Sequence, residues 1–181
     1  MNRTAVVYQS KYGSTEKYAK WIAETLSCNL FDRETVTVDE LRSYDTIIYG
    51  GGLYAGGVSG IDLITENFRC FSGKNIVLFT CGLADTSNPI NTDHIKMSLR
   101  KHFTNEMEEQ IKVFHLRGGI DYSKLSFMHK SMMSMLHKTL TKKNTDLLSD
   151  EVREMLETYG KKVDFTDRLS IAPLISYVQA L

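Results

Sequence analysis

The sequence holds little proline and little cysteine, and it carries no excess of either charge. Two prolines among 181 residues, with 42% hydrophobic and 24% charged residues, argue against a disordered or fibrous chain. The three cysteines, Cys28, Cys70 and Cys81, form no C-x-x-C pair, so neither a disulfide framework nor a cysteine-based zinc site is indicated. The 22 basic and 22 acidic residues cancel, and we therefore expect no nucleic-acid partner.

Long apolar runs are absent too. No stretch has the length of a membrane-spanning helix, and the first residues show no charged segment followed by an apolar core and a cleavage site. We therefore expect a cytoplasmic protein. The length suits one domain, which we predict to span residues 1–181.

Short apolar stretches alternate with segments of helical period. The stretches that suit buried strands are residues 4–9, 29–34, 45–50, 75–80 and 110–116. Helical patterns follow at residues 38–43, 61–68 and 95–103, and the apolar stripe Ala19, Ile22, Ala23 and Leu26 predicts another helix behind the first strand. This alternation predicts an α/β fold: a doubly wound, five-stranded parallel sheet with helices on both faces.

The loop after the first strand gathers hydroxyl groups at the expected start of a helix. It reads Ser10-Lys11-Tyr12-Gly13-Ser14-Thr15. Three hydroxyls and several backbone N–H groups at the positive end of a helix dipole make an anion site, and phosphate is its usual occupant. The alternative is an ordinary capped turn. The loop lacks G-x-x-x-x-G-K-[ST], so it does not predict a nucleoside triphosphate site with magnesium.

Two further loops follow the third and fourth strands: GGGLYAGG at residues 50–57 and TCGLAD at residues 80–85. The first matches a loosened G-x-G-x-x-G/A pattern, but that fingerprint belongs after the first strand, which argues against NAD. A glycine-rich loop with a central aromatic residue lets the main chain approach a flat ring. In a sheet of order 2-1-3-4-5 all three loops face one crevice. They predict one ligand with a phosphate and a planar ring, and flavin mononucleotide (FMN) has that shape.

The loop at residues 10–15 resembles the flavodoxin phosphate loop, [ST]-x-T-G-x-T, and the two later loops resemble that family's ring-binding loops. This likeness covers about the first 120 residues. It departs from the pattern at Tyr12, where flavodoxins usually carry Thr. Over most of its length the chain is more similar to the flavodoxin-like protoporphyrinogen dehydrogenases, which share an extra segment after strand five and a late Thr-Asp step, here Thr166-Asp167.

The resemblance implies that the cofactor is FMN, cycling between oxidised and reduced states. The phosphate set that it implies is Ser10, Lys11, Tyr12, Gly13, Ser14 and Thr15. One wall of the ring site would consist of Gly52, Leu53, Tyr54 and Ala55. The other wall would consist of Cys81, Gly82, Leu83, Ala84 and Asp85. No basic residue adjoins Cys81 in the sequence to lower its pKa, so we expect this thiol to pack rather than react.

Two classes of function fit these features. One is an oxidoreductase that acts on a substrate over the flavin, as in the protoporphyrinogen dehydrogenases, with residues 118–125 as a substrate wall and His115 and Tyr122 as candidates beside it. The alternative is a flavodoxin-type one-electron carrier between partner proteins. Such carriers are generally acidic, and the balanced charge here favours the oxidoreductase. No catalytic residue is assigned.

Residues 124–143 differ from the rest of this neutral chain, with five lysines, two histidines, no acidic residue and four of the eight methionines. As an inserted helix they would form an apolar stripe of Leu125, Met128, Met132, Met135, Leu136 and Leu140. The stripe either packs on the core or contacts an irregular apolar partner. That partner would be the anionic inner face of a membrane bearing quinone, or a porphyrin-like ring.

The histidine spacing does not predict a metal site. His94 and His102, like His129 and His137, lie eight residues apart, which is not the i, i+4 spacing that zinc ligands on a helix use. We expect all four on solvated helix faces.

Overall fold

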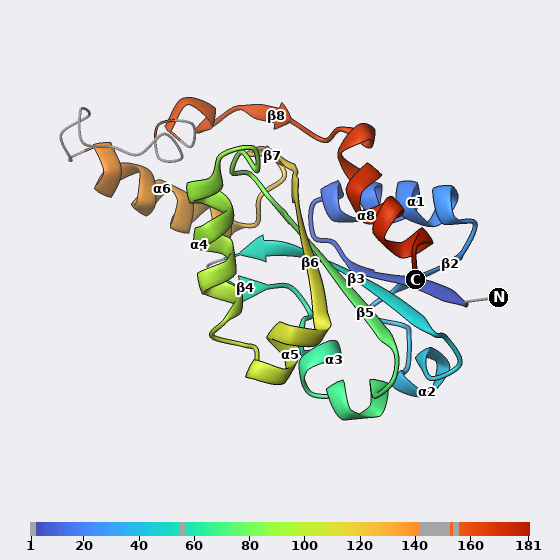
Figure 1. Cartoon of the computed structure of the whole chain (residues 1–181). Coiled ribbons are helices and arrows are strands. Elements are labelled where there is room, and N and C mark those ends of the chain that lie inside the picture. The colour runs from blue at the N-terminus through green and yellow to red at the C-terminus, as the bar shows by residue number, and fades with distance from the viewer. Residues whose placement is uncertain (1–2, 55–56, 142–152, 154–155) are drawn as a thin grey trace.

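The computed structural model describes residues 3–54, 57–141, 153 and 156–181 (Figure 1). The main sheet consists of β1 (Thr4–Gln9), β2 (Asn29–Asp32), β3 (Thr46–Tyr54), β4 (Gly57–Val58), β5 (Asn75–Gly82) and β6 (Ile111–Arg117). A second, two-stranded sheet pairs β7 (Gly119–Asp121) with β8 (Lys162–Asp164). The α-helices are α1 (Ser14–Leu26), α2 (Val38–Leu41), α3 (Asp62–Thr65), α4 (Pro89–Leu99), α5 (Asn105–Gln110), α6 (Phe127–Thr141) and α8 (Ala172–Gln179). Short 3-10 helices lie at η1 (Phe68–Phe71) and η3 (Arg168–Ile171).

The strand order of the main sheet is β2-β1-β3-β5-β6, and each neighbouring pair is parallel. This is the predicted order 2-1-3-4-5, which is confirmed. The short β4 pairs antiparallel with the end of β3 and lies off this path. Because the strands are parallel, the carboxyl ends of β1, β3 and β5 meet at one edge of the sheet.

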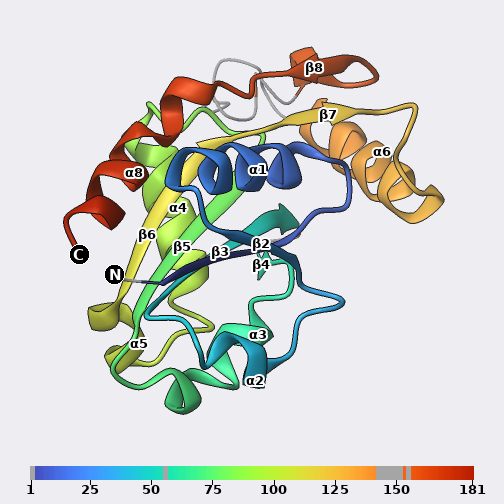
Figure 2. The same cartoon turned by 90° about the vertical axis from the view of Figure 1, so that its right-hand side faces the viewer.

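Helices cover both faces of the sheet, as predicted (Figure 2). Alternate residues of each strand enter opposite cores, because side chains of a strand alternate between its two faces. In β1, Val7 packs with residues of α2, α3 and α5, whereas Val6 packs with residues of α1 and α8. Ala5, Val6 and Val7 are all fully buried, as the apolar run of this strand predicts for a sheet covered on both sides.

The glycine-rich stretch after residue 49 is strand, and the prediction of a loop there is wrong. β3 continues to Tyr54, and Tyr54 pairs with Gly57 of β4. The reason is packing: a Cβ at Gly50 would collide with the Phe79 ring of β5. Glycine therefore lets a large side chain of the neighbouring strand lie directly over the backbone of β3.

Several predicted boundaries differ from the structure. α4 begins at Pro89 instead of residue 95, because the Asn88 side chain accepts a hydrogen bond from the Ile90 N–H (3.0 Å) and proline suits the first turn. A separate helix, α5, begins after Thr104, whose side chain accepts from the Met107 N–H. β2 ends at Asp32, two residues early, where the Asp32 carboxylate accepts from the Glu34 N–H and starts a turn.

The helical segment predicted after the fifth strand is present as α6, which lies beyond the carboxyl end of the sheet in both views (Figures 1 and 2). The helix covers residues 127–141 of the predicted 124–143, and Lys142 and Lys143 lie outside the described residues. Within the described part of the chain, none of the helices combines the length and the apolar character needed to span a bilayer.

Candidate functional site

A cavity of about 420 Å³ lies where the carboxyl ends of β1, β3 and β5 meet. Its lining from the three predicted loops is Ser10, Tyr12, Ser14, Thr15, Leu53, Tyr54, Cys81, Gly82 and Leu83. The remaining lining comes from the chain after β6: Gly118, Gly119, Ile120, Leu125, Met128, His129, Met132 and Met133. Hydroxyl groups thus lie on the loop after β1, while the other walls are mainly apolar.

Five residues predicted for the site do not line this cavity. Lys11 is exposed, and its ammonium lies 6.0 Å from the centre of the Tyr12 ring. Gly13 shapes the loop, and Gly52 is buried within β3. Ala84 and Asp85 follow the end of β5 outside the lining. Ala55, the remaining predicted residue, lies outside the described residues.

The loop after β1 opens the start of α1 to an anion. Gly13, the residue before the helix, has a left-handed φ of 97°, which glycine adopts without strain. Its N–H donates to Ser10 Oγ (3.1 Å), and none of the side chains that the structure describes caps α1. The first N–H groups of a helix have no partner inside it, so an uncapped start suits a phosphate group.

Ser14 and Thr15 connect this loop with neighbouring strands. Ser14 Oγ accepts a hydrogen bond from the Gly119 N–H (3.2 Å), and Thr15 is buried beside Cys81. Burial raises the pKa of the Cys81 thiol to about 12, against a smaller opposing effect of its hydrogen bond with Thr15. The thiol is therefore protonated at neutral pH and forms part of the cavity wall.

Arg117, at the end of β6, holds the loop after β5 in place. Its Nε donates to the Leu83 carbonyl oxygen (3.1 Å), and its guanidinium lies 3.6 Å from Asp85 Oδ2. Asp85 also accepts from the Ser87 N–H and hydroxyl, and these bonds, with a smaller contribution from Arg117, lower the pKa of its carboxyl. Asp85 therefore shapes the loop, while Leu83 reaches the cavity.

α6 forms a wall of the cavity that the sequence interpretation did not assign to the flavin site. Its contribution is Met128, His129, Met132 and Met133. The expectation of a solvated face for His129 is wrong, because its ring stacks on Tyr54 with centroids 5.6 Å apart, and its Nδ1 lies 2.6 Å from the Tyr12 hydroxyl. The apolar stripe indicated an apolar partner for α6, but no sequence signal placed His129 against two tyrosines.

The two candidate residues beside the predicted substrate wall, His115 and Tyr122, do not line the cavity. His115 is hydrogen-bonded to Thr80 within the sheet, and burial lowers its pKa to about 4, so it is neutral at pH 7. Tyr122 is buried against Tyr159, with ring centroids 5.1 Å apart. His137, also expected on a solvated face, stacks on the same Tyr159 at 4.0 Å.

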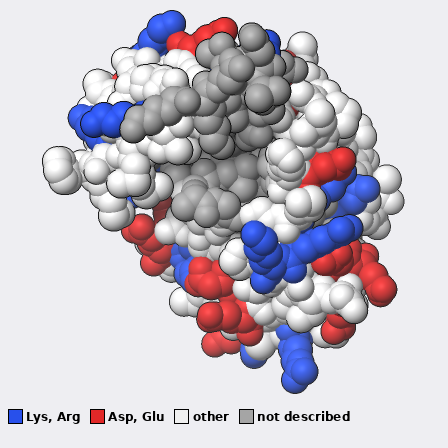
Figure 3. Space-filling view, turned by 90° about the vertical axis from the view of Figure 1, so that its left-hand side faces the viewer, with Lys and Arg blue, Asp and Glu red and all other residues white. Residues whose placement is uncertain are grey.

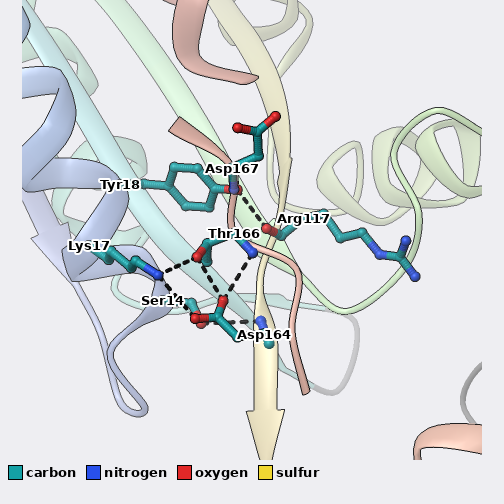
Figure 4. Close-up of polar contacts among 8 residues, drawn as sticks. Ser14, Lys17, Tyr18, Arg117, Asp164, Thr166 and Asp167 are labelled. Atoms are coloured by element: carbon teal, nitrogen blue, oxygen red, sulfur yellow. Dashed lines mark hydrogen bonds and ion pairs between the residues drawn. The ribbon is translucent and has the colours of Figure 1, made fainter. Parts of the chain in front are cut away.

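The C-terminal segment is bound to α1 by a set of polar contacts (Figure 4). Lys17 Nζ donates to Asp164 Oδ2 (3.0 Å) and to Thr166 Oγ1 (2.6 Å). The Tyr18 hydroxyl donates to the Arg117 carbonyl oxygen (2.7 Å) and accepts from the Asp167 N–H (3.0 Å). Thr166 and Asp167, the Thr-Asp step noted in the sequence, therefore attach the C-terminal segment to α1, the helix that follows the loop after β1.

A family model described as a flavodoxin domain matches residues 5–147. The chain belongs to the flavodoxin domain family. An uncharacterized protein of Methanocaldococcus jannaschii is 34% identical over 55 residues, which are 30% of this chain and 37% of that protein. The match thus spans little more than a third of that relative.

Solved structures similar to this flavodoxin domain include oxidised Flavodoxin 2 from Bacillus cereus. The two are 15% identical with a TM-score of 0.43, over 95% of this chain and 99% of that one. A flavoprotein in complex with FMN from Lactobacillus acidophilus is 14% identical with a TM-score of 0.43, over 65% of this chain and 93% of that one.

Among the described residues, no group of three or more histidine, cysteine, aspartate or glutamate side chains is placed to hold a metal ion.

Proposed function

We propose that this flavodoxin domain binds FMN in the cavity and acts as an oxidoreductase on a substrate held beside the flavin. The observation that carries the proposal is the composition of the cavity. Hydroxyls of Ser10, Ser14 and Thr15 lie at the uncapped start of α1, and the aromatic and apolar side chains of Tyr54 and Leu83 line other walls. This donor set fits a phosphate group joined to a flat ring, and FMN is the cofactor that the flavodoxin resemblance implies.

The chain's own residues have separable tasks in this proposal. The start of α1, with its hydroxyls, would hold the phosphate, while Leu53, Tyr54 and Leu83 would orient the ring and keep water from it. The volume of about 420 Å³ lies within the range of small-molecule sites, about 300–1,000 Å³. When bound, the flavin supplies electron transfer, which none of these side chains performs alone.

We propose a porphyrin-like substrate, as in the protoporphyrinogen dehydrogenases, with quinone as the acceptor. Met128, Met132 and Met133 give one wall of the cavity a flexible, polarizable lining, which adapts to a large and irregular apolar ring. These side chains belong to α6, which follows β6, the fifth parallel strand of the main sheet. This is the region in which the sequence resembles that branch of the family.

The side of α6 outside the cavity lining supports a peripheral contact with the anionic inner face of a membrane. Phe127 is 90% exposed and Met135 is 70% exposed. Lys130 and Lys138, on the same helix, are exposed as well. Exposed apolar side chains beside lysines are typical of helices that lie on an anionic lipid surface.

A one-electron carrier is the second candidate. It is favoured by the exposure of Met128 (63%) and Met132 (46%), which line the cavity and could also meet a partner protein. On the face drawn in Figure 3, however, acidic and basic side chains are interspersed, and no single acidic surface of the kind carriers use is gathered there.

Three measurements test the proposal. The purified protein, freed of any bound flavin and then mixed with FMN, should take up the cofactor and show a flavin absorption band that stays with the protein through gel filtration. The loaded protein should oxidise protoporphyrinogen with a quinone acceptor, and it should co-sediment with anionic but not with neutral vesicles.

Failure to take up FMN would overturn the central claim. Reduction by a flavodoxin reductase without porphyrinogen oxidation would favour the carrier, and equal sedimentation with both vesicles would remove the membrane contact.

A further inference from the structure

Tyr12 stands where flavodoxins usually carry Thr, and its hydroxyl contacts residues that are far from its own loop in the sequence. It lies 2.6 Å from His129 Nδ1, and it accepts a hydrogen bond from the Ser126 N–H (3.4 Å). These partners are 117 and 114 residues away in the chain. A single hydroxyl therefore connects the phosphate loop with the beginning of α6.

The contacts fall on the first turn of α6. Ser126 directly precedes the helix, and its Oγ accepts from the His129 N–H (3.3 Å), as a capping side chain does. The Tyr12 hydroxyl thus contacts Ser126, which caps the helix, and also the ring of His129, whose N–H is capped. These contacts lie at the start of α6.

Aromatic packing supports the same junction. The His129 ring stacks on Tyr54 with an interplanar angle of 21°, and Tyr12 meets both rings edge-on, with centroids 5.7 Å from His129 and 6.1 Å from Tyr54. The three rings come from the phosphate loop, the end of β3 and α6, and all three line the cavity. Ring pairs of this geometry stabilise a contact beyond the burial of their surface.

Many other side chains in the first half of α6 are exposed to solvent. Phe127 and Met128 are exposed, as are Lys130 and Ser131. Yet this half also supplies Met128, Met132 and Met133 to the cavity. The position of the methionine wall therefore depends on the contacts around Tyr12.

We propose that Tyr12 is a positioning residue that docks α6 on the phosphate loop, so that cofactor binding and closure of the methionine wall stabilise each other. This rests on the proposed function for the cofactor. A phosphate bound at residues 10–15 fixes the backbone that carries Tyr12, and the fixed hydroxyl holds Ser126 and His129. Because coupling between two binding events is reciprocal, a docked α6 in turn raises the affinity for the cofactor. Cofactor binding therefore favours the docked position of α6, in which the methionine wall is complete.

Hydrogen exchange of the α6 amides measures the docking directly. In the cofactor-free protein, Tyr12→Phe should speed exchange in the first half of α6 by about fivefold, the effect of losing a net hydrogen bond. FMN should slow exchange there in the wild type and much less in the variant. Riboflavin, which lacks the phosphate, should slow it less than FMN. Circular dichroism would verify that the variant is folded.

Two variants of His129 provide the specific comparison. His129→Asn keeps a polar atom close to the place of Nδ1 and should retain most of the protection, whereas His129→Leu should lose it as Tyr12→Phe does. The matched control is Tyr122→Phe, which removes a buried hydroxyl that finds no hydrogen-bond partner in the described part of the chain, and it should leave α6 exchange unchanged. The dissociation constant for FMN should also be about fivefold higher in Tyr12→Phe than in the wild type, since the docked helix no longer favours the bound state.

The outcomes separate this inference from the proposed function. Equal α6 exchange in the cofactor-free wild type and Tyr12→Phe would overturn the docking role, whatever the protein binds. Equal α6 exchange with and without bound FMN would overturn the coupling while leaving FMN as the cofactor. A protein that binds no FMN would overturn the proposed function and the coupling with it, and the cofactor-free comparison would still decide whether Tyr12 docks α6.

Discussion

Thr80 and His115 lie opposite each other in β5 and β6, and Thr80 Oγ1 is 2.8 Å from His115 Nδ1. Thr80 is fully buried, and burial lowers the pKa of His115 from 6.5 to about 4. The unfolded chain therefore binds a proton at His115 between about pH 6.5 and pH 4 that the folded chain does not. The stability associated with the neutral ring is present above pH 6.5 and is lost as the pH falls toward 4.

We expect the free energy of unfolding to decrease between pH 7 and pH 4 by on the order of 2 kcal/mol on account of His115, less than the full shift because the ring is only partly buried. His115→Gln keeps a hydrogen-bonding group opposite Thr80 but cannot take up a proton. It should show a smaller loss over the same range in urea titrations. Equal losses in the two proteins would mean that His115 titrates normally.

The phosphate loop is tested by Ser10→Ala. Ser10 Oγ accepts from the Gly13 N–H and lines the cavity, so its loss should weaken FMN binding by about 1 kcal/mol, or roughly fivefold. Riboflavin has no phosphate, and its affinity should change little. Isothermal titration of both ligands makes the comparison, and an equal loss for the two would place the effect at the ring rather than at the phosphate.

The close approach of two strands is tested by Gly50→Ala. The new methyl group would meet the Phe79 ring, and overpacking of this kind costs about 1–3 kcal/mol of unfolding free energy. Gly57→Ala is the matched control, because among the described residues a Cβ there would meet only the Tyr54 carbonyl oxygen, at 3.7 Å. Chemical denaturation should separate the two variants, and similar midpoints would show that Phe79 moves aside without cost.

The attachment of the C-terminal segment is tested by Tyr18→Phe. The Tyr18 side chain is buried, and its hydroxyl bonds both the Arg117 carbonyl and the Asp167 N–H, so its removal should cost about 1–3 kcal/mol. Amide exchange after residue 164 should also become faster. Tyr177→Phe, in a ring that packs on Phe114, serves as the control. Unchanged exchange at Asp167 would show that other contacts hold the segment.

The sheet could be predicted because its signals are local. The apolar run Ala5, Val6 and Val7 predicts a strand buried on both sides, and alternation with helices predicts the parallel order. The place of the loop after β1 beside the cavity could be predicted for the same reason, since its hydroxyls and Gly13 lie within six residues. The start of α4 was also signalled locally, by Asn88 before Pro89, although the helical period alone placed it later.

What the sequence did not show depends on contacts between distant residues. Glycines such as Gly50 are typical of loops, and only Phe79 on the neighbouring strand explains why they continue β3. The role of His129 arises from Tyr12 and Tyr54, more than 70 residues earlier in the chain. The pairing of β7 with β8 likewise joins segments whose residues 121 and 162 are far apart in the sequence.

That last pairing has a consequence for how the domain is built. β7 ends at Asp121 and β8 begins at Lys162, and these two residues pair with each other in the antiparallel β7–β8 sheet. The segment between them, which includes α6, therefore begins and ends at paired residues. Such an excursion can be lengthened, exchanged or removed without shifting the register of the main sheet, since the ladder would become a simple hairpin. The cavity wall supplied by α6 therefore belongs to a segment that can change without altering the strand order of the main sheet.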